Sequence, residues 1–148
     1  MKQYLNVKLK GLNTNNEIET YKLSDFSGNN LIVYFYPQDD TPICTQEAND
    51  FNEKIKEIGK YAKIVAVSSN DMQDHIEFKN KYNLKFILLS DTENKLKKAF
   101  EEYDRYTQNL HRATFILDKN GNIIKYWVKV DIDGHVEEVL EFIKTEFI

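Results

Sequence analysis

Cys44 is the only cysteine among the 148 residues, and its position favours nucleophilic chemistry. It follows an apolar segment, Leu31–Tyr36, and a short loop that runs from Pro37 to Pro42. The next residues have the spacing of a helix, so we expect the thiol in a first helical turn. Unpaired backbone N–H groups and the positive end of the helix dipole favour the thiolate there. Because the thiolate is the nucleophilic form of cysteine, Cys44 is a candidate catalytic residue.

Cys44 also has an inert interpretation, because free cysteines are among the most buried residues and often act as small hydrophobic side chains. Two features of its surroundings favour reactivity. The loop before Cys44 leaves the carboxyl end of an apolar strand, and open α/β sheets bind ligands at that edge. Thr41 lies three residues before the thiol, as the expected N-cap of the helix.

The elements around Cys44 predict a β-α-β unit. Leu31–Tyr36 is apolar on both faces, as expected of a central strand covered by helices. Pro42 takes the first helical position, where its missing N–H costs nothing. Gly59 ends the helix, whose expected buried face is Ala48, Phe51, Ile55 and Ile58. Lys63–Val67 is a second strand, expected to be parallel to the first through a right-handed crossover.

The rest of the chain predicts further strands and helices around this unit. We expect an N-terminal hairpin around the polar residues 13–16 and a second hairpin at Asn120-Gly121. The other expected strands are Gln3–Leu9, Glu17–Leu23, Phe86–Leu89, Ala113–Leu117 and Ile123–Val128. The other expected helices are Asp71–Tyr82, a helix that starts at Asp91, and a closing helix whose buried face runs from Val136 to Phe147. Met72, Ile76 and Tyr82 are the expected buried side of the helix at Asp71–Tyr82. This order predicts an α/β fold, a mixed sheet flanked by helices, of which the thioredoxin-like fold is the most familiar form.

Composition narrows the functional classes. The chain has 41% hydrophobic and 30% charged residues, which suits one globular domain over residues 1–148. A net charge of −4, with no long block of one sign, argues against nucleic acid or an anionic membrane as partner. No segment resembles a signal peptide or a membrane span, and a lone cysteine suits the reducing cytoplasm. The sequence shows no metal-ligand spacing and no phosphate loop, so we expect no metal and no cofactor.

The residues around Cys44 resemble the active-site signature of the peroxiredoxins, thiol-dependent peroxidases built on a thioredoxin fold. The signature is Pro37-x-x-x-Thr41-x-x-Cys44, and the wider segment Tyr34–Ala48 is similar to the bacterioferritin-comigratory, or peroxiredoxin Q, branch. The resemblance continues in Ser90-Asp91-Thr92, in Arg112-Ala-Thr-Phe-Ile-Leu-Asp118 and in His135-Val-Glu-Glu-Val-Leu of the closing helix. It therefore covers nearly the whole chain in the same order.

The resemblance implies a role for each of four residues. Cys44 would attack the terminal peroxide oxygen as a thiolate and become a sulfenic acid. Thr41 would offer its hydroxyl to the thiolate or the peroxide, and Pro37 would shield the pocket and shape its loop. Arg112 would stand over the sulfur as a permanent cation that favours the thiolate and stabilises charge on the departing oxygen. Hydrogen peroxide and alkyl hydroperoxides would be the substrates.

The chain departs from its branch at Asn49, where many relatives carry a resolving cysteine. The sulfenic acid would then be reduced by an external thiol, from thioredoxin, glutaredoxin or a small molecule. We expect a site that stays folded through the cycle, with the sulfenate open to solvent and prone to over-oxidation. The branch also implies a monomer or a weak homodimer.

Two other functions remain open at this stage. The missing resolver also suits a peroxide sensor or a thioredoxin-fold binding module in which Cys44 is oxidised without efficient turnover. A cysteine hydrolase would need a histidine beside Cys44. His75, His111 and His135 are far apart in the sequence, and each is expected at the surface. Asp39 and Asp40 are expected to be solvated loop residues.

Glu47 has two interpretations. An acid in a first helical turn is commonly a partner of the helix dipole. It would also repel a thiolate three residues away unless a cation neutralised it. We therefore expect Glu47 to support Arg112.

Overall fold

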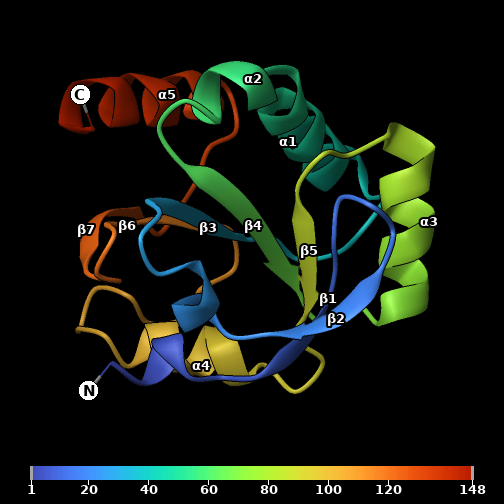
Figure 1. Cartoon of the computed structure of the whole chain (residues 1–148), viewed down its shortest axis with the longest axis horizontal. Coiled ribbons are helices and arrows are strands. Elements are labelled where there is room, and N and C mark those ends of the chain that lie inside the picture. Colours follow the sequence, from blue (N-terminus) through green and yellow to red (C-terminus); the bar gives the residue numbers. More distant parts are fainter. Residues whose placement is uncertain (1, 148) are drawn as a thin grey trace.

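The structure is a computed structural model that describes residues 2–147, and its centre is a mixed β-sheet (Figure 1). Within these residues the sheet has seven strands in the order β2-β1-β5-β4-β3-β6-β7. The strands are β1 (Leu9–Leu12), β2 (Ile18–Tyr21), β3 (Leu31–Phe35), β4 (Lys63–Ser68), β5 (Ile87–Ser90), β6 (Ala113–Leu117) and β7 (Ile123–Trp127).

Strand pairing confirms the predicted β-α-β unit and both predicted hairpins. β3 pairs in parallel with β4, and β4 with β5. The hairpins β1–β2 and β6–β7 are antiparallel. The sheet is mixed because β1 and β6 pair antiparallel to β5 and β3. The carboxyl ends of β3, β4 and β5 therefore meet at one edge of the sheet.

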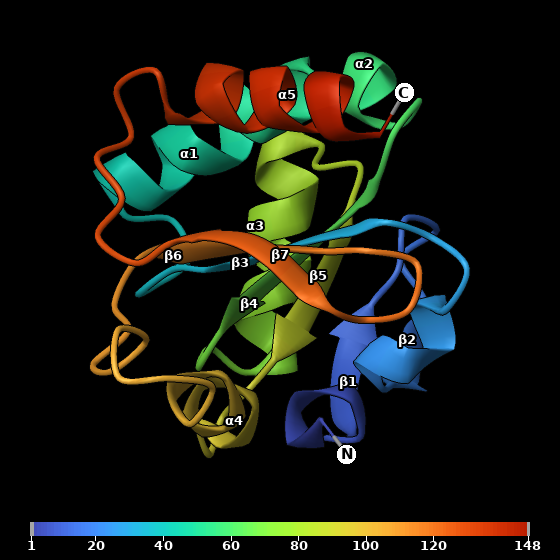
Figure 2. The same ribbon diagram turned by 90° about the vertical axis from the view of Figure 1, so that its left-hand side faces the viewer.

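Helices cover both faces of the sheet. In Figure 2, α1, α2 and α5 lie above the sheet and α4 lies below it. The helices are α1 (Pro42–Glu53), α2 (Ile55–Ile58), α3 (Met72–Tyr82), α4 (Lys95–Glu101) and α5 (His135–Glu146), with the 3-10 turns η1 (Gln3–Leu5) and η2 (Leu23–Phe26). No helix within residues 2–147 is long and apolar enough to cross a bilayer.

The alternation of side chains along β3 divides the core into two halves. Ile32 and Tyr34 pack with α1, α2, α3 and α5, and this half also contains Cys44. Val33 and Phe35 pack on the opposite side with α4 and the two 3-10 turns. A strand that serves two cores must be apolar on both faces, and all five residues of β3 are buried.

Three predicted boundaries are wrong. Residues 3–5 form a 3-10 turn instead of a strand, because the Tyr4 ring packs on Phe100 and its hydroxyl donates to the Gly121 oxygen. The helix that starts at Pro42 breaks at Lys54, so α2 is a separate turn. The next predicted helix starts at Lys95 and not at Asp91.

The Asp91 side chain explains the later start of α4, and the buried face of α3 is a further difference from the prediction. The Asp91 carboxylate accepts the backbone N–H groups of Leu96 and Lys97, so it stabilises the start of α4 from outside. On α3 the buried residues are His75, Phe78 and Lys79, and not the predicted Met72, Ile76 and Tyr82, which are only partly buried.

Phe51 attaches α1 to the sheet, which leads to a prediction. Its ring is fully buried and stacks on Tyr34 with 4.6 Å between ring centroids. Truncating a buried phenylalanine removes apolar contact and leaves a cavity, so Phe51→Ala should lower the free energy of unfolding by about 3–5 kcal/mol. Gln46→Ala, at an exposed position of the same helix, should change it by less than about 0.5 kcal/mol. Urea unfolding measures both variants, and equal losses would contradict this account of α1.

Candidate active site

The first turn of α1 places Cys44 as the sequence predicts. Thr41 is the N-cap residue with an extended backbone (φ −94°, ψ 155°), and Pro42 is the first helical residue. The Thr41 hydroxyl makes no capping bond and instead donates to the Gln38 backbone oxygen at 3.0 Å. Thr41 thus holds the predicted position, while its hydroxyl closes the loop and does not bond the sulfur.

Arg112 connects Cys44 with Glu47. One guanidinium nitrogen, Nη2, lies 3.3 Å from Cys44 Sγ, and Nη1 donates to Glu47 Oε1 at 2.7 Å. Cys44 is only 2% exposed, and the Arg112 and Glu47 side chains are 11% and 1% exposed. The guanidinium of Arg112 therefore lies against the sulfur, and the Glu47 carboxylate lies against the guanidinium.

Strand register explains how a residue so distant in sequence reaches Cys44. β3 and β6 are antiparallel, with Phe35 opposite Ala113. Arg112 therefore comes just before β6, at the edge where β3 ends and the chain turns toward α1. It has the same parity as Thr114 and Ile116, and Ile116 belongs to the core half that contains Cys44. A slip of one residue would send Arg112 to the other face.

Burial controls the charges in this site. Burial raises the pKa of Glu47 from 4.5 to about 7, against the charge and the hydrogen bond of Arg112, which lower it. Burial lowers the pKa of Arg112, but its bonds to Cys44 and Glu47 outweigh this and raise it above its ordinary value. Burial, together with the nearby Glu47 charge, raises the pKa of Tyr34 well above its ordinary value. The Tyr34 hydroxyl and Glu47 Oε2 are buried without a hydrogen-bond partner.

Asp39 is the residue that sequence reasoning missed. It was expected in solvent, but it is buried and accepts a hydrogen bond from the Tyr36 hydroxyl. Its second oxygen lies 2.6 Å from Nδ1 of His75, which is fully buried on α3. Asp40 is exposed as predicted, and it pairs with Lys81 and Tyr82 of the same helix.

A signal for His75 was present in the sequence. His75, Phe78, Lys79 and Tyr82 have the spacing i, i+3, i+4 and i+7, which marks one helical face. The face built on Met72 and Ile76 omitted Phe78, the most apolar residue that α3 buries.

No histidine is hydrogen-bonded to Cys44 within residues 2–147. His75 bonds Asp39 and the Leu89 oxygen, and His135 Nε2 lies 2.8 Å from the Thr114 hydroxyl. The predictions of a surface His75 and His135 are wrong because both are buried, whereas His111 is exposed as predicted. Burial lowers the pKa of His135 to about 4. A cysteine–histidine hydrolase therefore has no support in the geometry.

The pocket closest to these residues lies at the carboxyl edge of the parallel strands. Its volume is about 270 Å³, and Pro37, Ser68, Lys97 and His111 contribute to its wall. Pro37 is partly buried there, on the loop that leads to Cys44. No cluster of metal-binding side chains occurs within residues 2–147.

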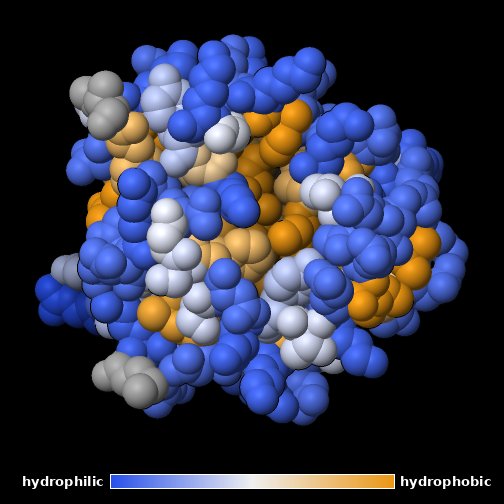
Figure 3. All heavy atoms as spheres, in the orientation of Figure 1, coloured by the Kyte–Doolittle hydropathy of each residue, from blue (hydrophilic) through white to orange (hydrophobic). Residues whose placement is uncertain are grey.

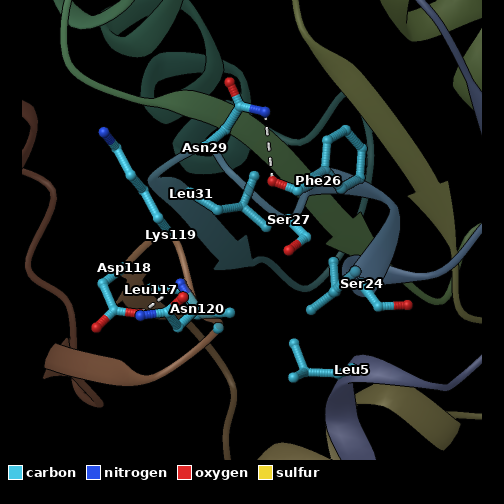
Figure 4. Close-up of a pocket in the computed structure, with 12 residues that line it drawn as sticks. Leu5, Ser24, Phe26, Ser27, Asn29, Leu31, Leu117, Asp118, Lys119 and Asn120 are labelled. Atoms are coloured by element: carbon cyan, nitrogen blue, oxygen red, sulfur yellow. Dashed lines mark hydrogen bonds between the residues drawn. The ribbon is translucent and has the colours of Figure 1, made fainter.

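Two other hollows lie away from Cys44. The close-up in Figure 4 shows a pocket lined by Leu31, Leu117 and Asp118, at the end of β3 and β6 opposite to Arg112. On the face shown in Figure 3, hydrophobic residues gather in a hollow near the middle. A pocket of about 390 Å³ lies where β4 and β5 begin, between Ile64 and Phe86. Neither pocket is lined by a residue that contacts the sulfur.

Comparison with known proteins gives consistent results. The AhpC/TSA family model matches residues 2–126. Peroxiredoxin Bcp of Bacillus subtilis is 41% identical over 133 residues, covering 85% of each chain. The putative peroxiredoxin bcp of Coxiella burnetii is 38% identical over 131 residues, covering 84% of this chain and 87% of that protein.

Solved structures agree with these relatives. The structure of Xanthomonas campestris peroxiredoxin Q has a TM-score of 0.86 and 32% identity, covering 98% of this chain and 94% of its own. A structure of the Xanthomonas campestris bacterioferritin comigratory protein, described for its alkyl peroxide reduction activity, has a TM-score of 0.85 and 31% identity, with the same coverage. The fold is the thioredoxin-like fold of these proteins. The chain thus belongs to the AhpC/TSA family and is a peroxiredoxin of the Bcp and peroxiredoxin Q type, a thiol-dependent peroxidase.

Proposed function

We propose that Cys44 is the peroxidatic residue and that Arg112 is its cationic partner. The observation that carries this proposal is the pair of bonds by which Arg112 contacts Cys44 Sγ and the buried Glu47. A buried guanidinium beside sulfur stabilises the thiolate, and its remaining N–H groups can donate to a peroxide oxygen. Cys44, Arg112 and Glu47 are residues that the sequence analysis singled out.

The first reaction is a displacement on oxygen. The Cys44 thiolate attacks the terminal peroxide oxygen, the O–O bond breaks, and the departing oxygen takes up the proton that the thiol had released, so that water or an alcohol leaves. The sulfur is oxidised to sulfenic acid as the peroxide is reduced. Arg112 stabilises charge on the departing oxygen. Thr41 and Pro37 form the loop beside the thiol, where we propose that they orient the peroxide and exclude water.

The second reaction requires another molecule's thiol. Within the sequence no other cysteine exists, so a thiol attacks the sulfenic acid, water leaves, and a mixed disulfide forms. A second thiol then displaces Cys44 as thiolate. We infer that thioredoxin, glutaredoxin or a small thiol of the cytoplasm supplies this step. The exposed large hydrophobic side chains are Ile18, Ile43, Tyr103, Tyr106 and Ile124, and of these Tyr103 and Ile124 line one pocket. We infer a monomer or a weak homodimer, as the resemblance to this branch implies.

The burial of Cys44 changes one expectation. We expected the site to stay folded through the cycle with the sulfur open to solvent, but the Cys44 residue is only 2% exposed. A reductant must approach the sulfur directly, so the first turn of α1 must open for the second reaction. The exposed Pro42 and Ile43 of this turn leave it free to do so.

A peroxide sensor is the second candidate function, and the absence of a resolving cysteine favours it. A sensor would be oxidised once and would not turn over. The test is peroxide consumption with dithiothreitol in excess, for the chain and for Cys44→Ser. We expect many peroxides reduced per Cys44 and none in the variant. If Cys44 is oxidised once and no further peroxide is consumed, even when several different thiols are supplied, the protein is a sensor.

Removing Arg112 tests the proposed cation. Arg112→Ala should slow the oxidation of Cys44 by hydrogen peroxide about 100-fold, because a preorganised donor to the developing oxyanion is lost. Arg105→Ala is the control, since it is the chain's other arginine and is exposed. The rate is followed by loss of the free thiol after rapid quenching. If Arg112→Ala and Arg105→Ala react equally fast, Arg112 has no role in the oxidation.

The charge of Glu47 predicts a pH effect on stability. Between pH 4.5 and about 7 the folded protein retains a proton on Glu47 that the unfolded chain releases, so this group's contribution to stability decreases as pH rises. Glu47→Gln removes the titration. The stability of the natural chain relative to this variant should fall by about 3 kcal/mol across that range. Urea unfolding at several pH values measures it, and parallel curves would show that Glu47 does not titrate there.

The missing resolver predicts over-oxidation. With no second cysteine, the sulfenic acid persists until a thiol arrives, so added peroxide should convert it to sulfinic acid. Intact mass after graded peroxide should show one and then two added oxygens per chain. A Cys44-linked dimer that appears before any oxygen adduct would contradict this prediction.

A further inference from the structure

The loop that carries Pro37 and Thr41 is attached to α3 by its middle residue. Asp39 lies two residues from each of them, and its side chain is 4% exposed. One carboxylate oxygen faces Nδ1 of His75 at 2.6 Å, and the other accepts from the Tyr36 hydroxyl. The backbone N–H of Asp39 donates to Asn70 Oδ1, just before α3. The mechanism above gives no function to Asp39 or His75.

The hydrogen bonds of Asp39 and His75 determine how many protons the two side chains hold together. His75 Nε2 lies 2.9 Å from the Leu89 backbone oxygen, which can only accept, so Nε2 carries a hydrogen. A separation of 2.6 Å between Nδ1 and the Asp39 oxygen also requires a hydrogen, since two lone pairs would repel. The pair is therefore carboxylate with imidazolium, or carboxylic acid with neutral imidazole. Both forms have the same number of protons and no net charge.

The pair is fully hydrogen-bonded, which is what its burial requires. Tyr36 supplies its hydroxyl hydrogen, and the burial of its ring and the nearby Asp39 raise the pKa of Tyr36 well above its ordinary value. Removing either partner would leave the other buried and unpaired, which costs more than keeping the pair. The pair therefore fixes Asp39 to α3 in one arrangement.

The loop needs such an attachment because its conformation is unusual. Asp40 has φ +58°, in the left-handed region that residues other than glycine rarely adopt. The Thr41 hydroxyl bonds the Gln38 oxygen across the same turn. The other side-chain bonds from this loop to α3 come from Asp40, and they are exposed.

We propose that Asp39 and His75 are positioning residues for the oxidation of Cys44. The buried pair holds the midpoint of loop 37–41 against α3 and so keeps Pro37 and Thr41 beside the thiol. This proposal rests on the proposed function, in which Pro37 and Thr41 orient the peroxide. Neither Asp39 nor His75 contacts the sulfur, so neither is a catalytic residue.

The chain offers a graded set of variants. Asp39→Ala breaks the pair. Asp39→Asn can keep every bond, because the amide oxygen accepts from Tyr36 and the amide nitrogen donates to Nδ1 of neutral His75. Asp40→Asn is the matched control, since it removes the charge of an adjacent carboxylate that bonds the same helix through exposed contacts of small value, and asparagine tolerates the positive φ of this position.

The experiment measures the second-order rate of Cys44 oxidation by hydrogen peroxide in a single turnover, below the melting temperature of each variant. We expect Asp39→Ala to be at least about tenfold slower, because misplacement by about 1 Å costs that much or more. Asp39→Asn should stay within about threefold of the natural chain and Asp40→Asn within about twofold. His75→Ala should match Asp39→Ala, and the double variant should be no slower than either single variant.

Several results would overturn the proposal. Asp39→Ala with lower stability but an unchanged rate would make the pair purely structural. Asp39→Asn as slow as Asp39→Ala, or Asp40→Asn as slow as Asp39→Ala, would show that the hydrogen-bonded pair is not what holds the loop. Failure of the proposed peroxidase function can be told apart from failure of this proposal. Turnover with thiols can be absent while the single oxidation of Cys44 is still measurable.

Discussion

Arg112 holds the site together, because one guanidinium bonds both Cys44 and Glu47. That contact depends on the antiparallel register of β3 and β6, which brings a residue from far along the chain to the start of α1. It depends equally on α1, whose first turn carries the sulfur and whose second carries Glu47 three residues later. The sheet therefore positions the guanidinium, and α1 positions the sulfur and the carboxylate that the guanidinium bonds.

Burying these charges is costly unless they pair, and the pairing in this site is incomplete. Arg112 and Glu47 satisfy each other at 2.7 Å, but Glu47 Oε2 and the neighbouring Tyr34 hydroxyl have no partner. Unsatisfied buried polar groups are rare, and they concentrate where function outweighs stability. Arg112 also contacts Cys44 Sγ, so the same guanidinium bonds both the carboxylate and the sulfur.

The sequence predicted the fold and the central contact well, for identifiable reasons. The apolar run at Leu31–Tyr36 and the helical spacing after Pro42 are strong local signals, and they gave the β-α-β unit and the position of Cys44. The place of Arg112 came from the resemblance to peroxiredoxins, since local spacing does not determine which strands pair.

The errors arose where tertiary contacts override local pattern. Tyr4 turns residues 3–5 into a 3-10 helix through a hydrogen bond to the distant Gly121. Asp39 and His75 looked like solvent-exposed polar residues, but both are buried and hydrogen-bonded to each other, to Tyr36 and to the Leu89 backbone oxygen. A polar pair of this kind has no apolar periodicity to reveal it, although Phe78 marked the correct face of α3.

If Glu47 acts through Arg112, the two side chains are coupled, and a double-mutant cycle on the rate of Cys44 oxidation measures that coupling. The cycle compares the natural chain, Glu47→Leu, Arg112→Ala and the combined variant with hydrogen peroxide. We predict that Glu47→Leu slows the reaction about tenfold when Arg112 is present, because the guanidinium loses its anchor, and has almost no effect in the Arg112→Ala background. Losses that multiply independently in the combined variant would contradict the account.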